Sequence, residues 1–265
     1  MATPQNIPLP YNPKIGKTAL DSAVGDQDSH ESPRKTLTVS IIIPVYNESV
    51  HVSAVVDRIL HCKVPDGVSK EIIVIDDGST DGTTEILKGL SSTLVKVHHS
   101  VLNFGKGTAI RIGLRYVTGD IVLIHDGDRE YDPAEIQRVI RPIVNGTAKV
   151  VYGSRFMGQI DGMYFRYWLA NKLFIAAVWI LYGTYITDEA TAYKAFDAQL
   201  IKSIPLNCRR FEFCPEITAK VLRRGVKIFE VPITYRARTV EQGKKIRAMD
   251  AFDAFWTLLR YRFGK

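Results

Sequence analysis

Apolar runs and helical patterns alternate along the chain from residue 37 onward. Runs rich in β-branched residues predict buried strands at 37–45, 71–75, 94–98, 121–124 and 150–152. Between them, apolar positions at helical spacing predict helices at 50–61, 79–90, 106–117 and 133–144. Strands that alternate with helices of this length are typical of βαβ units. The pattern therefore predicts an α/β fold, a mainly parallel twisted sheet flanked by helices.

The alternation changes near residue 155. A long helix at 166–182, a strand at 192–196, a helix at 213–224 and a strand at 227–232 follow. We interpret residues 37–265 as a single domain, in which 37–155 and 156–248 supply two binding halves and 249–265 form a C-terminal amphipathic helix. Residues 1–36 are rich in Pro, Asp, Ser and Lys and lack the apolar core of a signal peptide, which predicts a disordered tail.

Composition and charge narrow the class of protein. The three cysteines, Cys62, Cys208 and Cys214, are widely spaced, which indicates a reducing compartment and neither a disulfide framework nor a zinc site. Residues 209–265 carry 14 basic and 6 acidic residues, whereas 37–208 are almost neutral. Such a basic surface attracts phosphates, anionic lipids or nucleic acid. Because no nucleic-acid-binding motif is present, we expect no nucleic-acid partner.

Two apolar segments bear on membranes. The longest uninterrupted apolar run, 173–182, has ten residues, too few to span a bilayer. We expect a buried helix there, with a helix at the membrane interface as the alternative. The segment 251–263 places Phe252, Phe255, Trp256 and Leu259 at helical spacing, close to two arginines. Aromatics beside arginines suit a headgroup boundary, although the same residues could pack on the sheet. We expect peripheral binding on the cytoplasmic face of a membrane.

The triplet Asp126-Gly127-Asp128 is the strongest chemical signal. It follows the strand predicted at 121–124 and precedes Asp132 and Pro133, which suit a helix N-cap and a first helical residue. Ligands of open α/β sheets bind at this edge. Two adjacent carboxylates repel each other unless a cation lies between them, and hard cations such as Mg²⁺ or Mn²⁺ also hold phosphate oxygens. Gly127 leaves the backbone between the acids accessible to a bulky group.

Several nucleotide sites are excluded. The first strand ends in Pro-Val-Tyr-Asn-Glu, without the Gly-x-Gly-x-x-Gly of a dinucleotide site. The Gly105-Lys106-Gly107-Thr108 segment lacks the earlier glycine of a P-loop. Nucleotide-sugar pyrophosphorylases would carry a glycine-rich loop after the first strand, and none is present.

An ordered set of motifs resembles one known family. The set comprises Pro44-Val45-Tyr46-Asn47-Glu48, Asp76-Asp77-Gly78-Ser79-Thr80-Asp81, Asn103-x-Gly105-Lys106-Gly107, Asp126-Gly127-Asp128, Gly153-Ser154-Arg155-Phe156, Thr187-Asp188-x-x-Thr191 and Glu241-x-Gly243-Lys244-Lys245-Ile246. It is similar to inverting family 2 glycosyltransferases of the type A fold. The last two motifs resemble the branch that makes polyprenyl-phosphate sugars, such as the dolichyl-phosphate mannose synthases.

The resemblance implies a donor site in the first half. It places a nucleotide sugar, UDP-glucose or GDP-mannose, on Pro44, Tyr46, Glu48, Asp76, Asp77, Gly105, Lys106 and Asp126. It implies Mg²⁺ or Mn²⁺ on Asp126, Asp128 and Glu130. Dolichyl-phosphate mannose synthases have Gln where this chain has Glu130, so metal and donor preference stay open.

The resemblance also implies an acceptor site for a polyprenyl or dolichyl phosphate. It places the acceptor phosphate on Arg155 and on the start of the following helix, where Arg166 and Asn171 lie. Arg236, Arg238 and Lys244 are further candidates, since they follow the nucleotide half and arginine offers a planar fork suited to phosphate oxygens. A hydroxyl acceptor needs a general base, whereas a phosphate is already an anion. Asp188 is the obvious base candidate, and for a phosphate acceptor it would instead orient the sugar or the arginines. Asp128, Asp188 and Arg155 are the expected catalytic residues, with Lys244 or Lys245 stabilising the departing diphosphate.

The sequence thus predicts a metal-dependent hexosyltransferase that moves glucose or mannose to a polyprenyl phosphate with inversion. Two alternatives remain. One is transfer to a hydroxyl of a protein, lipid or polysaccharide, although the Gln-x-x-Arg-Trp motif of processive polysaccharide synthases is missing. The other is a non-catalytic membrane-surface adaptor with the same fold, against which the intact acidic triplet argues.

Overall fold

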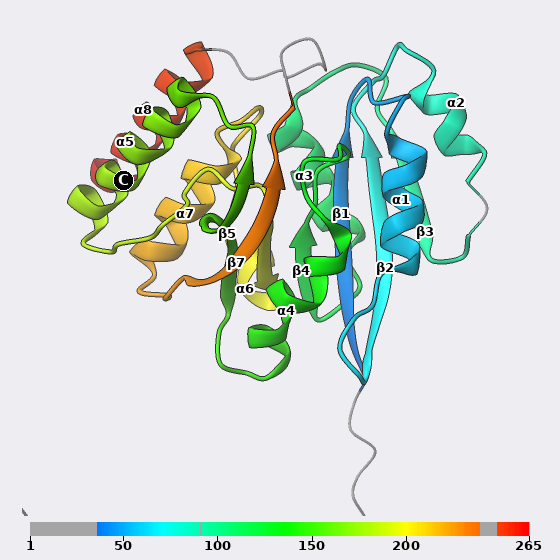
Figure 1. Cartoon of the computed structure of the whole chain (residues 1–265), viewed down its shortest axis with the longest axis horizontal. Helices are drawn as coiled ribbons and strands as arrows, with labels where there is room; N and C mark the ends of the chain where they lie inside the picture. Colours follow the sequence, from blue (N-terminus) through cyan, green and yellow to red (C-terminus); the bar gives the residue numbers. More distant parts are fainter. Residues whose placement is uncertain (1–35, 91, 239–247, 265) are drawn as a thin grey trace, which may run out of the picture. The chain divides into compact units, whose positions relative to one another are not determined.

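One sheet organises the part of the chain that the structure, a computed structural model, describes, namely residues 36–90, 92–238 and 248–264. The tail expected at 1–36 lies outside these residues except for Thr36. Within them, seven strands pair in the order β3-β2-β1-β4-β6-β5-β7 (Figure 1). The strands are β1 (Leu37–Val45), β2 (Val68–Asp76), β3 (Val95–His99), β4 (Ile121–Ile124), β5 (Val150–Asp161), β6 (Lys194–Asp197) and β7 (Phe229–Arg236). Only β6 runs antiparallel to its neighbours β4 and β5, so the mainly parallel sheet is confirmed.

Helices cover both faces of this sheet. They are α1 (Val52–His61), α2 (Thr83–Lys88), α3 (Lys106–Tyr116), the 3₁₀ turn η1 (Pro133–Glu135), α4 (Ile136–Val144), α5 (Phe165–Tyr182), α6 (Ala198–Lys202), α7 (Phe213–Arg223) and α8 (Ala248–Phe263). One apolar core unites the sheet with α1, α2 and α4, and a second unites it with α3, α6 and α7.

The central strands are apolar on both sides because each face of the sheet packs against one of the two cores. Ile41 and Ile43 face the core of α1 and α4, whereas Ile42 between them faces the core of α3 and α7. Burial on both faces explains why these strands read as continuous apolar runs and do not alternate with polar residues.

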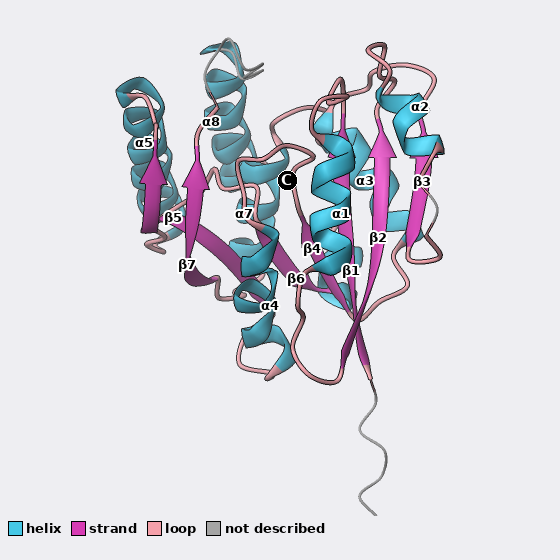
Figure 2. Cartoon of the chain, turned by 45° about the vertical axis from the view of Figure 1, so that its right-hand side comes forward, coloured by secondary structure: helices cyan, strands magenta, loops and turns pink. Residues whose placement is uncertain are grey.

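Helices α5 and α8 lie side by side beyond the sheet, where they pack on each other and on α7 (Figures 1 and 2). Only part of α5 is covered: Val178 is buried, whereas Leu173 and Ile180 are 62% and 77% exposed. The helix expected to be buried at 173–182 is therefore buried on one side only. None of the described helices has the combination of length and apolar character that crossing a bilayer requires.

Some elements differ from the sequence-based expectation. Strand β5 continues to Asp161, nine residues past its predicted end, because its second part pairs with β7 beyond an irregularity between Ser154 and Gln159. The short helix α6 had no signal in the apolar pattern. Asp132 is confirmed as an N-cap, since its side chain accepts a hydrogen bond from the Ala134 amide.

Candidate active site

The loops after β1 and β2 are fastened to each other at the carboxyl edge of the sheet. The Asn47 amide donates to Ser79 Oγ at 2.9 Å, and Asn47 Oδ1 accepts from the Thr80 amide at 2.8 Å. Asn47 has a positive φ of 50°, a conformation that asparagine tolerates better than most residues. Next to it, the Glu48 amide donates to Thr83 Oγ1. These bonds fix the backbone on which Pro44, Tyr46 and Glu48 lie.

Asp76 is a buried anchor of the β2 end. Its carboxylate accepts hydrogen bonds from the Ser79 amide and Thr84 Oγ1, and His99 Nδ1 lies 3.1 Å away. Burial alone would raise the pKa of Asp76, but the hydrogen bonds outweigh it and leave the pKa below its ordinary value. Asp76 thus stays ionised and rigid.

Asp77 holds the loop that leads into α3. Its two carboxylate oxygens accept from the amides of Phe104, at 3.0 Å, and Gly105, at 2.6 Å. Burial raises the pKa of Asp77, against the effect of these two bonds. The motifs at 76–81 and 103–107 are therefore brought together as the resemblance implied, and Asp77 positions the start of α3.

Lys106, the first residue of α3, reaches the acidic triplet. Its Nζ lies 2.5 Å from Asp126 Oδ1. Burial would lower the pKa of this amine, but the charge of Asp126 outweighs it and raises the pKa. One carboxylate of the triplet is thus already paired with a cation from the glycine-rich segment.

The other acids of the triplet region form a cluster around Arg238. Its guanidinium donates to both oxygens of Glu48, at 3.1 and 3.2 Å, and to Asp128 Oδ2 at 2.6 Å. Glu130 accepts from the Arg238 amide at 2.9 Å and from Tyr235 Oη at 3.0 Å. We call Glu48, Asp128, Glu130 and Arg238 the acid cluster.

Burial dominates the chemistry of Asp128. It raises the pKa of this carboxyl to about 7, with further contributions from the nearby charges of Asp126 and Glu130, while Arg238 acts in the opposite direction. The crowding of negative charge is what an additional cation would relieve.

The residues fit a divalent cation that is completed by a substrate. In the described parts of the chain, no three His, Cys, Asp or Glu side chains are arranged to hold a metal ion by themselves. Mg²⁺, however, usually takes one or two carboxylates together with phosphate oxygens and water. Asp128, with Asp126 two residues before it, meets that requirement, and the Glu130 carboxylate adjoins them.

Gly127 has a packing role that the sequence did not indicate. A Cβ at this position would lie 2.9 Å from Cγ2 of Val45. On the side where a Cβ would lie, the space beside Gly127 is therefore filled by the end of β1, which gives a packing reason for glycine here.

Arg155 and Asp188 form a second, inner charged group. Arg155 Nε and Nη2 each lie 2.7 Å from an oxygen of Asp188, and Nη2 also donates to Asn171 Oδ1 at 3.1 Å. Arg155 is 6% exposed and Asp188 fully buried. Burial would lower the pKa of Arg155, but Asp188 outweighs it and raises the pKa well above its ordinary value. Three predicted site residues from separate segments thus meet.

Two residues of β7 that the sequence analysis missed connect these groups. The Tyr235 hydroxyl donates to Glu130, and its ring lies under the Arg155 guanidinium, 5.0 Å from centroid to Cζ. Glu230 accepts from the amides of Thr187 and Asp188. The signal was available, since Glu230 and Tyr235 occur in a strand that ends next to two predicted site arginines.

The remaining predicted site residues lie apart from these groups. Arg166 is exposed at the start of α5, over the rings of Tyr164 and Tyr167. Arg236 is exposed at the end of β7. Lys244, Lys245 and the rest of their motif lie outside the described residues.

A buried polar layer, also missed, lies behind the inner pair. Lys194 is fully buried, with Nζ 2.7 Å from the Glu189 carbonyl oxygen and 3.6 Å from the centroid of the Tyr152 ring. Burial lowers the pKa of Lys194 and raises that of Glu189. Because these residues follow the Thr-Asp motif directly, they support the loop that carries Asp188.

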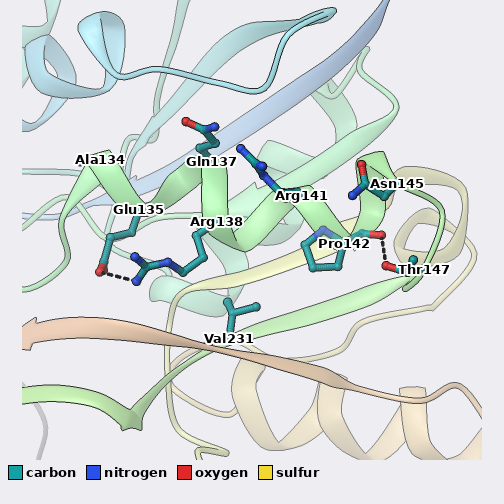
Figure 3. A pocket seen from close by; sticks show the side chains of 9 residues that line it. All are labelled: Ala134, Glu135, Gln137, Arg138, Arg141, Pro142, Asn145, Thr147 and Val231. Carbon is teal, nitrogen blue, oxygen red and sulfur yellow. Dashed lines mark hydrogen bonds and ion pairs between the residues drawn. The ribbon is translucent and has the colours of Figure 1, made fainter. Parts of the chain in front are cut away.

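A hollow of about 530 Å³ lies elsewhere, along α4 (Figure 3). Arg138, Arg141 and Val231 are among its lining residues, and none of the predicted site residues is. This hollow is therefore separate from the candidate active site.

Residues 40–204 match the model of the family described as glycosyl transferase family 2. The chain belongs to this family. The family 2 assignment agrees with the positions of the seven motifs, six of which lie entirely within the matched residues.

Curated relatives of this family 2 glycosyltransferase act on lipid phosphates, according to their names. The UDP-N-acetylglucosamine–dolichyl-phosphate N-acetylglucosaminyltransferase of Methanococcus voltae is 28% identical over 249 residues, which cover 86% of this chain and 97% of the relative. The dodecaprenyl-phosphate galacturonate synthase of Rhizobium johnstonii is 27% identical over 84% of this chain. The dolichol-phosphate mannosyltransferase of Pyrococcus furiosus is 29% identical over 78% of it. The chain spans 64% and 59% of the length of these last two relatives.

Solved structures confirm the type A glycosyltransferase fold. Glucosyl-3-phosphoglycerate synthase from Mycobacterium tuberculosis, in complex with Mn²⁺, UDP and glucosyl-3-phosphoglycerate, superposes with a TM-score of 0.65. It is 21% identical, and the match covers 85% of this chain and 80% of that one. Mannosyl-3-phosphoglycerate synthase from Rubrobacter xylanophilus has a TM-score of 0.66 at 22% identity, over 85% and 72% of the two chains.

Proposed function

We propose that this family 2 glycosyltransferase moves a hexose from a nucleotide sugar to a polyprenyl or dolichyl phosphate, with inversion and with a divalent metal. The observation that carries the proposal is the buried acid cluster at the carboxyl edge of the sheet, which Tyr235 connects to the inner pair of Arg155 and Asp188. The lipid-phosphate acceptors named for the relatives support the same acceptor class.

The donor would lie on the loops after β1, β2 and β4. Tyr46 and Glu48 lie in the first loop, and Asp77 and Gly105 shape the neighbouring one. Asp126 and Asp128 would hold Mg²⁺ or Mn²⁺, which when bound supplies positive charge to the diphosphate. Lys106 lies against Asp126 and adds a fixed positive charge at the same place.

The inner ion pair favours a phosphate acceptor over a hydroxyl. Asp188, the base candidate, has one oxygen bonded to Arg155 Nε and the other to Arg155 Nη2. Both oxygens of this carboxylate are thus already occupied by hydrogen bonds from one guanidinium. A lipid phosphate needs none, because its oxygen is already ionised. Asp188 then orients Arg155, whose buried positive charge would contact the acceptor phosphate.

In the reaction, an oxygen of the acceptor phosphate attacks the anomeric carbon in line. The bond from that carbon to the diphosphate oxygen breaks, and the nucleoside diphosphate leaves with the electron pair. The chain's part is to align the two substrates and to neutralise the diphosphate charge.

The acceptor would arrive along α5 and α8. Asn171, in the second turn of α5, bonds Arg155, so the first turns of α5 border the inner site. Phe165, Trp168 and Leu169 in those turns are at least 39% exposed. We propose that this apolar surface lies against the cytoplasmic face of a membrane, which would present the lipid phosphate at the site.

A donor screen tests the activity. UDP-glucose, GDP-mannose, UDP-N-acetylglucosamine and UDP-galacturonate are each incubated with polyprenyl phosphate and Mg²⁺ or Mn²⁺, and products are resolved by mass. We expect one hexosyl phosphate lipid from UDP-glucose or GDP-mannose. Product only on a hydroxyl acceptor would redirect the assignment, and the absence of transfer and hydrolysis with every donor would support the adaptor alternative.

The metal site has its own prediction. Asp128→Asn keeps the size of the side chain but removes a charged ligand, so we expect turnover to fall at least about a hundredfold, as for the loss of several kcal/mol of charge stabilisation. Excess chelator should abolish turnover of the unaltered enzyme, and Mg²⁺ or Mn²⁺ should restore it. Near-normal rates in either experiment would count against the metal assignment.

A further inference from the structure

Arg238 forms hydrogen bonds with carboxylate oxygens that would otherwise be available to coordinate a metal ion. Its guanidinium bonds Asp128 Oδ2 and both oxygens of Glu48, and its amide bonds Glu130. The Arg238 side chain is 14% exposed, and those of Glu48 and Asp128 are 9% and 8% exposed. The group is therefore a largely dry cluster in which one guanidinium neutralises part of the charge of three carboxylates.

The guanidinium is not fully satisfied in this position. Arg238 Nε is buried and has no hydrogen-bond partner among the described residues, and the nearest oxygen of Glu130 is 3.9 Å from it. A buried donor without an acceptor costs free energy. Arg155 contrasts with it, because both Nε and Nη2 of that guanidinium have acceptors. Arg238 is thus held less completely than the other buried arginine of the site.

We propose that Arg238 is a positioning residue that makes metal binding depend on the nucleotide. In the free protein its guanidinium takes the place of a cation at Asp128, so a divalent ion alone must displace it. When a nucleoside diphosphate binds, the Arg238 guanidinium can exchange its hydrogen bonds to the carboxylates for hydrogen bonds to phosphate oxygens. Phosphate oxygens also complete the coordination shell of the metal ion. The inference rests on the proposed function for the identity of the site, and it adds the order in which its ligands assemble.

Binding of Mn²⁺ followed by electron paramagnetic resonance tests this without any sugar transfer. The full chain and Arg238→Gln are titrated with Mn²⁺ alone, and then with Mn²⁺ in the presence of UDP or GDP. We expect Arg238→Gln to bind Mn²⁺ alone about tenfold or more tightly than the unaltered chain. UDP or GDP, whichever binds more tightly, should raise the Mn²⁺ affinity of the unaltered chain. We expect this increase to be smaller in Arg238→Gln, because Arg238 couples the binding of nucleotide and Mn²⁺.

Matched variants separate this effect from a general change in charge. Arg58→Gln removes a guanidinium that bonds Asp132, four residues beyond Asp128 and outside the acid cluster, and should leave Mn²⁺ affinity unchanged. Arg238→Lys keeps the charge without the fork and should fall between the unaltered chain and Arg238→Gln. Thermal unfolding of each variant checks that it is folded.

The outcomes are separable from those of the donor screen. Mn²⁺ binding to Arg238→Gln that is no tighter than to the unaltered chain overturns the inference. An equal gain in Arg58→Gln also overturns it, since the effect would then be one of net charge. If the Mn²⁺ result is as expected but the screen yields no lipid product, the metal device stands and the proposed acceptor fails.

Discussion

At the scale of residues, the site is built from arginines that differ in how firmly they are held. Arg155 has Asp188 and Asn171 as partners within hydrogen-bond distance and a tyrosine ring beneath it. Arg166 lies exposed on aromatic rings. A buried charge pair is costly to break from one side, because the remaining charge is left without a partner. The fork of Arg155 is thus needed for the fold of the site, in addition to the acceptor role that we propose for it.

We predict that Arg155→Lys affects stability and acceptor use together. Lysine keeps the charge but cannot bond both oxygens of Asp188, so unfolding free energy should fall by about 1–3 kcal/mol. Urea denaturation measures this, and kinetics with varied polyprenyl phosphate should show weaker acceptor use. The affinity for UDP or GDP should stay close to normal, and an equal loss there would indicate a purely structural arginine. Arg166→Lys is the control for stability and should unfold like the unaltered chain.

At the scale of elements, Glu71 on β2 links its own strand to β1, to β3 and to the turn before β4. Its carboxylate accepts from Ser40 Oγ at 2.6 Å, from Lys96 Nζ at 2.7 Å and from the Thr118 amide at 2.8 Å. Burial alone would raise the pKa of Glu71, but these bonds outweigh it and lower the pKa to about 2. One side chain thereby ties together strands and a turn on which the site loops are mounted.

This lowered pKa predicts how stability depends on pH. The folded chain holds Glu71 ionised down to about pH 2, whereas in the unfolded chain its pKa is near the ordinary 4.5. The contribution, about 2–3 kcal/mol, is therefore complete above pH 4.5 and is lost as the pH falls toward 2. Glu71→Gln should be less stable than the unaltered chain at pH 7, and the difference should shrink between pH 4.5 and 2.

Denaturation curves at a series of pH values check this prediction. Glu85→Gln, at an exposed position on α2, is the matched control and should unfold like the unaltered chain at every pH. A difference for Glu71→Gln that stays constant across the range would show that loss of packing, not of the ionised carboxylate, causes it.

At the scale of the whole described domain, the sheet has the site at its carboxyl edge and an apolar surface on two outer helices. This apolar surface consists of the large exposed apolar side chains of α5 and α8, namely Phe165, Trp168, Leu169, Leu173, Trp179, Ile180, Phe252, Phe255, Trp256 and Phe263. Exposed apolar side chains gathered on two adjacent helices indicate an interaction surface. Arg260 and Arg262 near the end of α8 add positive charge beside it.

We predict that this surface binds anionic liposomes. Sedimentation of the full chain with vesicles of phosphatidylglycerol and phosphatidylcholine should carry it into the pellet at low salt, and salt should weaken binding because each basic group near the surface contributes about 1 kcal/mol. Trp256→Glu and Ile180→Glu should each reduce binding, since they place a charge among the apolar side chains. Leu94→Glu, at an exposed apolar position before β3, should bind normally. Protein that stays in the supernatant at low salt would mean that the acceptor reaches the site by another route.

The apolar pattern was sufficient to predict a mainly parallel sheet flanked by helices, although not α6 or the second part of β5. Strands buried on both faces must be apolar throughout, so β1, β2 and β4 were visible as continuous runs. The chain reverses between parallel strands by way of a helix, so each strand must end at the same edge of the sheet. The strand pattern therefore predicted the ligand-binding edge for Asp126 and Asp128, whereas Asp77 was assigned to the same site by the family resemblance.

Which charges meet at that site depended on the tertiary structure. Arg238 and Glu48 are 190 residues apart in the chain, yet they form an ion pair. Arg155 and Asp188, which are 33 residues apart, form another. Sequence spacing gives no distance between side chains that reach one another from different strands. For the same reason, the run at 173–182 was apolar enough to be buried, but only the packing of α5 on α7 and α8 decided which of its sides is covered. Hydropathy measures how much free energy burial would release, whereas the folded chain has room to cover only part of that surface.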